Sequence, residues 1–216
     1  MPPLTESNTL PHVSLAASLK RLAWAWAVIM FGLFLFGLAI VLMVQAGIGL
    51  GPWDVFHVGF SKTTGMSLGA ASQVTGLAVI VIAWAAARIK PSAGMVANMI
   101  FIGVFIDLLM PRIPRPQGFA AQLAVFIAGT VLLGLATAIY LKAGLGAGPR
   151  DGLMLGLSHI TGRSVRLVRT GIELAALLAG ALMGGQVGLG TIIFALSVGP
   201  VVQASLRLFK VQRTAT

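Results

Sequence analysis

The sequence predicts an all-α membrane protein with about six transmembrane helices, arranged as two copies of one three-helix unit. Its 216 residues are 57% apolar and only 9% charged, whereas a soluble domain is roughly 25% charged. Several stretches carry no charge over the roughly 20 residues that a helix needs to cross a bilayer. A glycine-rich phrase also occurs twice, which indicates an internal duplication.

The two copies of this phrase are AGIGLGPWD at 46–54 and AGLGAGPRD at 143–151, separated by an offset of 97 residues. A second shared motif, Ser-x-x-Thr-Gly, follows at 61–65 and at 158–162. The chain is therefore divided into five segments: a disordered cytoplasmic tail, a first repeat, a linker, a second repeat and a cytoplasmic tail, at residues 1–21, 22–110, 111–118, 119–208 and 209–216.

Each unit contains the same series of elements. A long apolar helix, 22–45 or 119–142, is ended by the glycine phrase, because clustered glycine terminates helices. A short amphipathic segment then follows. Two further apolar helices complete the unit. The short segments are 52–63 and 149–160, and the later helices are 69–88 and 93–110 in the first copy and 167–184 and 187–208 in the second.

The short segments decide the predicted topology. Twelve helical residues extend about 18 Å, against about 30 Å of hydrocarbon, so each segment is expected to be a half-helix or re-entrant element rather than a crossing. Such an element is allowed in a membrane where protein surrounds it. Each unit then crosses three times, and this odd number predicts that the second copy is inverted.

The positions of the basic residues favour this inversion. Arg150, Arg163, Arg166 and Arg169 of the second copy correspond to uncharged residues in the first. The charges therefore lie at opposite ends of the two copies, as one positive-inside rule requires for oppositely oriented units. With both termini cytoplasmic, only three of the 15 basic residues fall outside, namely Lys62, Arg112 and Arg115. The net charge of +10 is thus explained by topology, without nucleic acid.

The candidate site lies where the half-helices begin. Pro52 and Pro149 suit a first helical turn, which places Asp54 and Asp151 at the third helical position. One interpretation is that each Asp caps its helix, and the other is that broken helices build a substrate site between the repeats. A carboxylate at this position favours a cationic, zwitterionic or polar solute over an anion. The candidate substrate-binding residues are Asp54, Asp151, Gly49, Gly51, Gly146, Gly148 and His57.

Two further acids are weaker candidates for a proton or ion relay. Glu173 follows Arg169 by four residues, so an interfacial salt bridge is the alternative for it. Asp107 lies near the end of its helix. No nucleophile–base pair is visible, the chain has no cysteine, and its histidines lack metal-ligand spacing. We therefore expect no enzymatic activity, no cofactor and no metal.

The doubled AGxGxGPxD phrase, the Ser-x-x-Thr-Gly motif and the glycines at Gly190 and Gly199 resemble the YczE-type bacterial membrane proteins, which are similar to the broader YitT-type group. The resemblance extends over residues 24–208. It implies a multi-pass protein of the bacterial cytoplasmic membrane. The family is largely uncharacterised, and some of its members are linked to secondary-metabolite production.

Two functions are compatible with these observations. The first is a small transporter or permease with its site between the repeats, and its partners would be the lipid bilayer and a small-molecule solute. The second is a non-transporting accessory or scaffold protein that supports a partner enzyme or transporter. The sequence leaves open whether the chain forms a homo-oligomer or binds another membrane protein.

Overall fold

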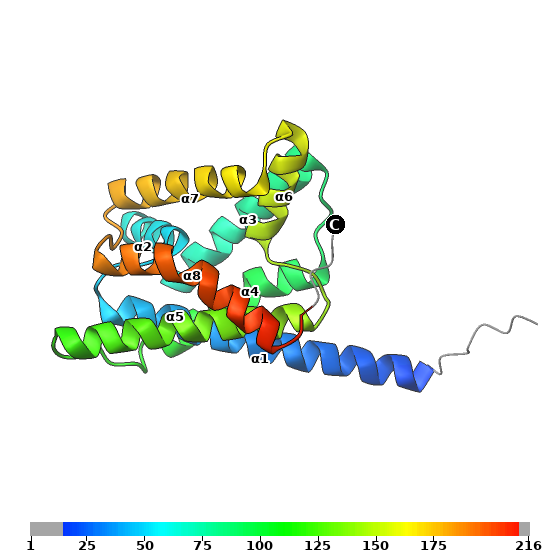
Figure 1. Cartoon of the computed structure of the whole chain (residues 1–216), viewed down its shortest axis with the longest axis horizontal. Coiled ribbons are helices and arrows are strands. Elements are labelled where there is room, and N and C mark those ends of the chain that lie inside the picture. The colour runs from blue at the N-terminus through cyan, green and yellow to red at the C-terminus, as the bar shows by residue number, and fades with distance from the viewer. Residues whose placement is uncertain (1–14, 212–216) are drawn as a thin grey trace, which may run out of the picture.

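A computed structural model describes residues 15–211, in which all regular secondary structure is α-helical. This confirms the all-α prediction. The eight helices of this part of the chain are α1 (Leu15–Ala46), α2 (Pro52–Thr64), α3 (Leu68–Ala87), α4 (Ala93–Leu109), α5 (Phe119–Lys142), α6 (Pro149–Thr161), α7 (Val165–Leu182) and α8 (Leu189–Leu208). Figure 1 shows α1 and α5 side by side as the two long helices of the molecule.

Four helices, α1, α3, α5 and α8, are long and apolar enough to cross a membrane. The helix α4 is also apolar but has 17 residues, or about 26 Å of helix. The helix α7 has 18 residues and carries three charges, on Arg166, Arg169 and Glu173. The half-helices α2 and α6 have 13 residues each, or about 20 Å, which is short of the hydrocarbon thickness.

One helix boundary differs clearly from the prediction. The tail expected over residues 1–21 is already helical from Leu15, because α1 runs without interruption from Leu15 to Ala46. The sequence Ala16-Ala17-Ser18-Leu19 contains good helix formers, and Lys20-Arg21 marks a membrane interface without ending a helix. Residues 1–14, and 212–216 of the predicted C-terminal tail, lie outside the described residues.

The core lies along the contact between α1 and α5. Leu33, Val41 and Met43 on α1 and Phe126 on α5 are fully buried there. Glycine allows the two backbones to approach closely, since a Cβ atom on Gly32 would lie 2.7 Å from the backbone nitrogen of Tyr140. The two long helices thus form a central pair, on which the other elements are arranged.

The other helices pack in matching pairs around this centre. The helix α4 packs on α1, and α8 packs on α5. The half-helix α2 packs on α7, and α6 packs on α3. Each half-helix therefore packs on a helix from the other half of the chain, α2 on α7 and α6 on α3.

The Ser-x-x-Thr-Gly motif ends both half-helices in the same way. The Oγ of Ser61 donates to the Met66 carbonyl oxygen at 2.7 Å, and the Oγ of Ser158 donates to the Arg163 carbonyl oxygen at 2.6 Å. Gly65 and Gly162 follow with φ of 74° and 65°, the left-handed conformation that ends helices. The motif is accounted for by helix termination and the turn into the next helix.

Candidate functional site

The first turns of α2 and α6 line one partly open cavity of about 390 Å³. Gly51 and Gly148 are the N-cap residues of these helices, with extended backbone, and Pro52 and Pro149 occupy the first turn. Proline suits this place because its missing N–H needs no partner there. The two glycine phrases are far apart in the sequence, but the helices that begin after them both start at this cavity.

The phrases are held in place by backbone contacts with the opposite half. The Gly190 N–H donates to the Ile48 carbonyl oxygen at 2.7 Å, and the Gly94 N–H donates to the Leu145 carbonyl oxygen at 2.8 Å. Each phrase thus binds the first turn of α8 or α4. Leu50 adds a third bond in the first half, since its N–H donates to the Thr191 Oγ1 at 3.2 Å.

The four candidate glycines separate into two roles. Gly49 and Gly146 have φ of 116° and 110° and pack against Gly188 and Ser92, so they shape the phrase and are not part of the cavity lining. Gly51 and Gly148 do line the cavity. A Cβ on Gly51 would lie 2.6 Å from the Phe194 ring, and a Cβ on Gly148 would lie 3.3 Å from the Asn98 amide oxygen.

Asp54 lines the cavity from the first turn of α2 and is only 4% exposed. Its Oδ1 is buried and accepts no hydrogen bond, and no side-chain hydrogen bond caps α2. The nearest titratable partner is His57, whose Nδ1 lies 3.7 Å from the Asp54 Oδ1. His57 is 3% exposed and also lines the cavity. A buried carboxylate oxygen without a hydrogen-bond donor is costly, so a donor placed in the cavity beside Asp54 would be stabilising.

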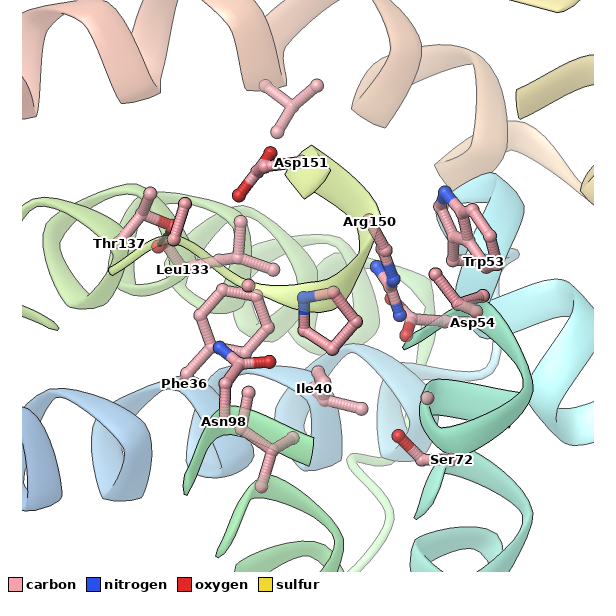
Figure 2. A pocket seen from close by; sticks show the side chains of 18 of the residues that line it. Phe36, Ile40, Trp53, Asp54, Ser72, Asn98, Leu133, Thr137, Arg150 and Asp151 are labelled. Atoms are coloured by element: carbon pink, nitrogen blue, oxygen red, sulfur yellow. Dashed lines mark hydrogen bonds between the residues drawn. The ribbon is translucent and has the colours of Figure 1, made fainter. Parts of the chain in front are cut away.

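Arg150 and Trp53 occupy the same place in the two phrases and lie against each other. The guanidinium carbon of Arg150 lies 4.7 Å from the centre of the Trp53 ring, within the range of a cation–π contact. Figure 2 shows the Arg150 side chain directed toward Trp53 and Asp54, while Asp151 on the same half-helix points to the other side of the cavity. The two helix starts therefore meet through equivalent positions of their phrases.

The cavity contains one more acid than strong base. Its lining includes the carboxylates of Asp54, Asp151 and Glu173, and the guanidinium groups of Arg150 and Arg169. When all three acids are ionised and His57 is neutral, one negative charge is left over. Membrane interiors tolerate such charges only where they pair or face a polar cavity. This balance makes the cavity more favourable for a positive group than for a simple anion.

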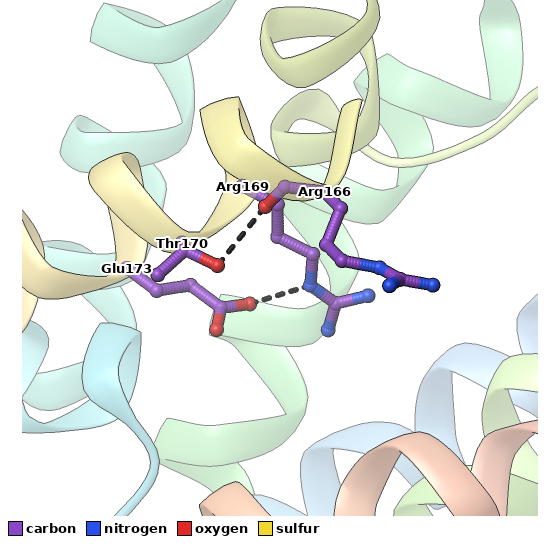
Figure 3. A network of polar contacts seen from close by, with 4 residues as sticks. All are labelled: Arg166, Arg169, Thr170 and Glu173. Atoms are coloured by element: carbon purple, nitrogen blue, oxygen red, sulfur yellow. Dashed lines mark hydrogen bonds and ion pairs between the residues drawn. The ribbon is translucent and has the colours of Figure 1, made fainter. Parts of the chain in front are cut away.

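Glu173 forms the ion pair that the sequence offered as its alternative role. The Arg169 Nε donates to the Glu173 Oε1 at 2.7 Å, and Figure 3 shows this pair on α7 beside the bond from the Thr170 hydroxyl to the Arg166 carbonyl oxygen at 2.9 Å. The Arg169 and Glu173 side chains are 50% and 31% exposed, and both line the cavity. The pair thus belongs to the cavity wall.

Asp107 lies away from the cavity, at the far end of α4. Its Oδ1 accepts from the Gly69 N–H at 2.8 Å, and its Oδ2 accepts from the Ser67 hydroxyl at 2.6 Å. Asp107 therefore holds the start of α3 against the end of α4. Within residues 15–211, no group of three or more His, Asp or Glu side chains comes close enough to hold a metal ion.

The sequence did not predict two charged cavity residues of the second half. Arg150 was interpreted as a topological charge, and Arg169 as a topological charge and a salt-bridge partner of Glu173, yet both line the cavity. A signal for them exists in the repeat, since Arg150 replaces Trp53 and Arg169 replaces Ser72, and both of these counterparts also line the cavity. The signal is a charged residue in one copy whose counterpart in the other copy lines the cavity.

Comparison with known proteins identifies relatives of this chain. The model of a family of unknown function, DUF6198, matches residues 23–207. An uncharacterized membrane protein, YczE of Bacillus subtilis, is 35% identical over 87% of this chain and 87% of its own length. An uncharacterized protein of Haemophilus influenzae is 35% identical over 84% and 83%, and the uncharacterized protein YyaS of Bacillus subtilis is 28% identical over 75% and 82%. No solved structure matches significantly.

Proposed function

The chain belongs to the DUF6198 family and is related to the membrane protein YczE, as its motifs predicted, and from this premise we propose that it is a transporter for a small cationic or zwitterionic solute. The solute would bind in the cavity between the starts of α2 and α6. One observation carries the proposal: Asp54 is almost fully buried on the cavity wall and its Oδ1 has no hydrogen-bond partner.

The chemistry of the lining supports this solute class. An amine or guanidinium group would give the Asp54 Oδ1 the hydrogen-bond donor it lacks, and would offset the surplus negative charge of the cavity. Arg150 and Arg169 would receive the carboxylate of a zwitterion. The remaining wall is largely apolar, with Phe36, Ile40 and Leu133.

We further propose that the two halves are inverted repeats, with α1, α3, α4, α5, α7 and α8 as six crossings in the bacterial cytoplasmic membrane and both termini in the cytoplasm. The paired packing supports this arrangement, because α2–α7 and α6–α3 are equivalent contacts under the offset of the repeat. A binding site at the interface of such repeats, formed by interrupted helices, is the usual design of secondary transporters.

The topology has a direct test, since the chain has no cysteine of its own. Met66 and Arg163 are exposed and lie at equivalent places after the two half-helices. In whole cells, a membrane-impermeant maleimide is expected to label Met66→Cys, and to label Arg163→Cys only after permeabilisation. Arg112→Cys and Lys90→Cys serve as outside and inside controls. Labelling of both test positions from the same side would contradict the inverted arrangement.

Transport is tested with purified protein in liposomes that are incubated with a bacterial metabolite extract and washed. Mass spectrometry of the contents is expected to show at least one amine- or guanidinium-bearing compound that empty liposomes lack. The Asp54→Asn/Asp151→Asn variant should not accumulate it, while Lys90→Gln, an exposed change outside the cavity, should behave as wild type. Equal contents in wild-type and empty liposomes would contradict transport and would favour an accessory role.

A further inference from the structure

The last two helices of each half are arranged differently in the two halves. The helices α3 and α4 pack along each other. Among the described residues, α7 and α8 form no such packing, and Figure 1 shows them running apart from the short connection that joins them. Because the two halves share their sequence pattern, this difference needs a local cause.

The contact between α3 and α4 depends on small residues and one carboxylate. Gly69 and Gly103 bring the two backbones together, and a Cβ on Gly103 would lie 2.6 Å from the Gly69 carbonyl oxygen. The Gln73 Nε2 donates to the Ile100 carbonyl oxygen at 2.9 Å. Asp107 completes the contact through its bonds to Ser67 and to the Gly69 N–H. The start of α3 and the end of α4 are therefore in direct contact, with no opening between them.

Within the described part of the chain, the equivalent residues of the second half are exposed or make no close contact with a neighbouring helix. Arg166 corresponds to Gly69 and is exposed, and Gln203 corresponds to Asp107 and is also exposed. Gly199 corresponds to Gly103, and a Cβ built on it would meet nothing within 4 Å. The second half therefore keeps a glycine at the position that packs closely in the first half, but nothing packs on it in this state.

The lining of the cavity differs between the two halves in the same way. On α8 it is lined along four successive turns, by Phe194, Val198, Val202 and Leu206. On α4 it is lined by Asn98, Met99 and Ile102, and the next residue of the row that contains Asn98 and Ile102, Ile106, is 1% exposed in the core. The cavity thus extends along α8 almost to the end of that helix, and stops before the part of the α3–α4 contact that Gly69, Gly103 and Asp107 form.

We propose that these two ends are alternating gates of the transport site. In this state the α7–α8 gate is open, toward the cytoplasm in the proposed topology, and the α3–α4 gate is closed by Asp107. In the other state α7 closes on α8 over Gly199, and the bonds of Asp107 to the start of α3 are released. The proposal rests on the proposed transport function, because alternating access needs two gates that are never open together.

Distances between spin labels in liposomes test the gates. Pulsed electron paramagnetic resonance measures one pair of cysteines across each gate and one control pair between α1 and α5, all at exposed positions. The pairs are Val165→Cys/Leu208→Cys for α7–α8, Met66→Cys/Leu108→Cys for α3–α4, and Phe31→Cys/Val131→Cys for the control. The absence of native cysteine restricts the labels to these positions.

Two variants are each expected to favour the other state, in which the α7–α8 gate is closed and the α3–α4 gate is open. Arg166→Gly/Gln203→Asp gives the second half the closing residues of the first, and should shorten the α7–α8 distance by about 5 Å or more, the rise of one helical turn. The same variant should lengthen the α3–α4 distance. Asp107→Asn weakens the closed gate and should lengthen the α3–α4 distance while the α7–α8 distance shortens. The control distance should remain fixed in both variants.

The outcomes separate this inference from the proposed function. If both gate distances stay unchanged in both variants while the protein accumulates solute, the gates are refuted and transport stands. If only one distance changes, the gates are independent and the alternation is refuted. If the α7–α8 distance shortens and the α3–α4 distance lengthens but no solute accumulates, the two gates are supported and the transport proposal is refuted.

Discussion

Asp54→Asn is expected to lower accumulation of the transported solute by at least about tenfold without lowering the unfolding temperature of the protein. The loss corresponds to a charge contact of about 1.4 kcal/mol or more. The thermal result follows because the Asp54 Oδ1 is buried and accepts no hydrogen bond, so the substitution removes a buried charge and breaks no bond to that atom. Liposome accumulation and thermal unfolding in detergent measure the two quantities.

Asp54→Ala distinguishes this role from helix capping. Loss of a capping side chain costs about 1 kcal/mol of stability, which lowers the unfolding temperature by a few degrees. A protein that transports normally but unfolds earlier with Asp54→Ala would show that the residue is a cap. Asp151→Asn is the partner measurement, because Asp151 holds the same place on α6 and lines the same cavity.

Gly49→Ala is expected to destabilise the fold by about 2–5 kcal/mol. An L residue in the left-handed region costs about 1–2 kcal/mol, and overpacking adds about 1–3 kcal/mol. Both apply here, since Gly49 has a φ of 116° and its new Cβ would lie 2.7 Å from the Gly188 backbone nitrogen. Reduced yield of folded protein and an earlier unfolding transition are the expected readouts.

Gly144→Ala is the matched control for this change. Gly144 belongs to the second phrase and has a φ of 70°, but a Cβ there would meet nothing within 4 Å. Only the backbone strain applies, so we expect a loss of about 1–2 kcal/mol. If the two substitutions destabilise the protein equally, the contact between the first phrase and the start of α8 does not contribute to its stability.

The helix ends were predictable wherever the signal is local. The half-helices were expected at 52–63 and 149–160 and are found at Pro52–Thr64 and Pro149–Thr161, because proline opens a helix and glycine closes one within a few residues. The start of α1 was placed too late, since the charges of Lys20-Arg21 indicate a membrane surface and say nothing of where the helix begins.

The site was predictable in part. The repeat indicated that Asp54 and Asp151 belong to equivalent places, and both line the cavity. The sequence could not indicate that Arg150 would lie against Trp53, because that contact depends on how two distant half-helices meet. The replacement of Gly69 by Arg166 in the second copy can be read from the sequence. Its effect within residues 15–211, that α3 packs on α4 whereas α7 does not pack on α8, is seen only in the structure.

The crossed hydrogen bonds of the glycine phrases have a consequence for assembly. Ile48 is bonded by Gly190 and Leu145 by Gly94, so the backbone turn of each half is completed by the other. Neither 22–110 nor 119–208 contains the partner for its own phrase, and each half alone would leave that carbonyl unpaired. Under the proposed repeat, the chain therefore resembles two subunits with exchanged contacts, which the short segment at 111–118 joins into one polypeptide.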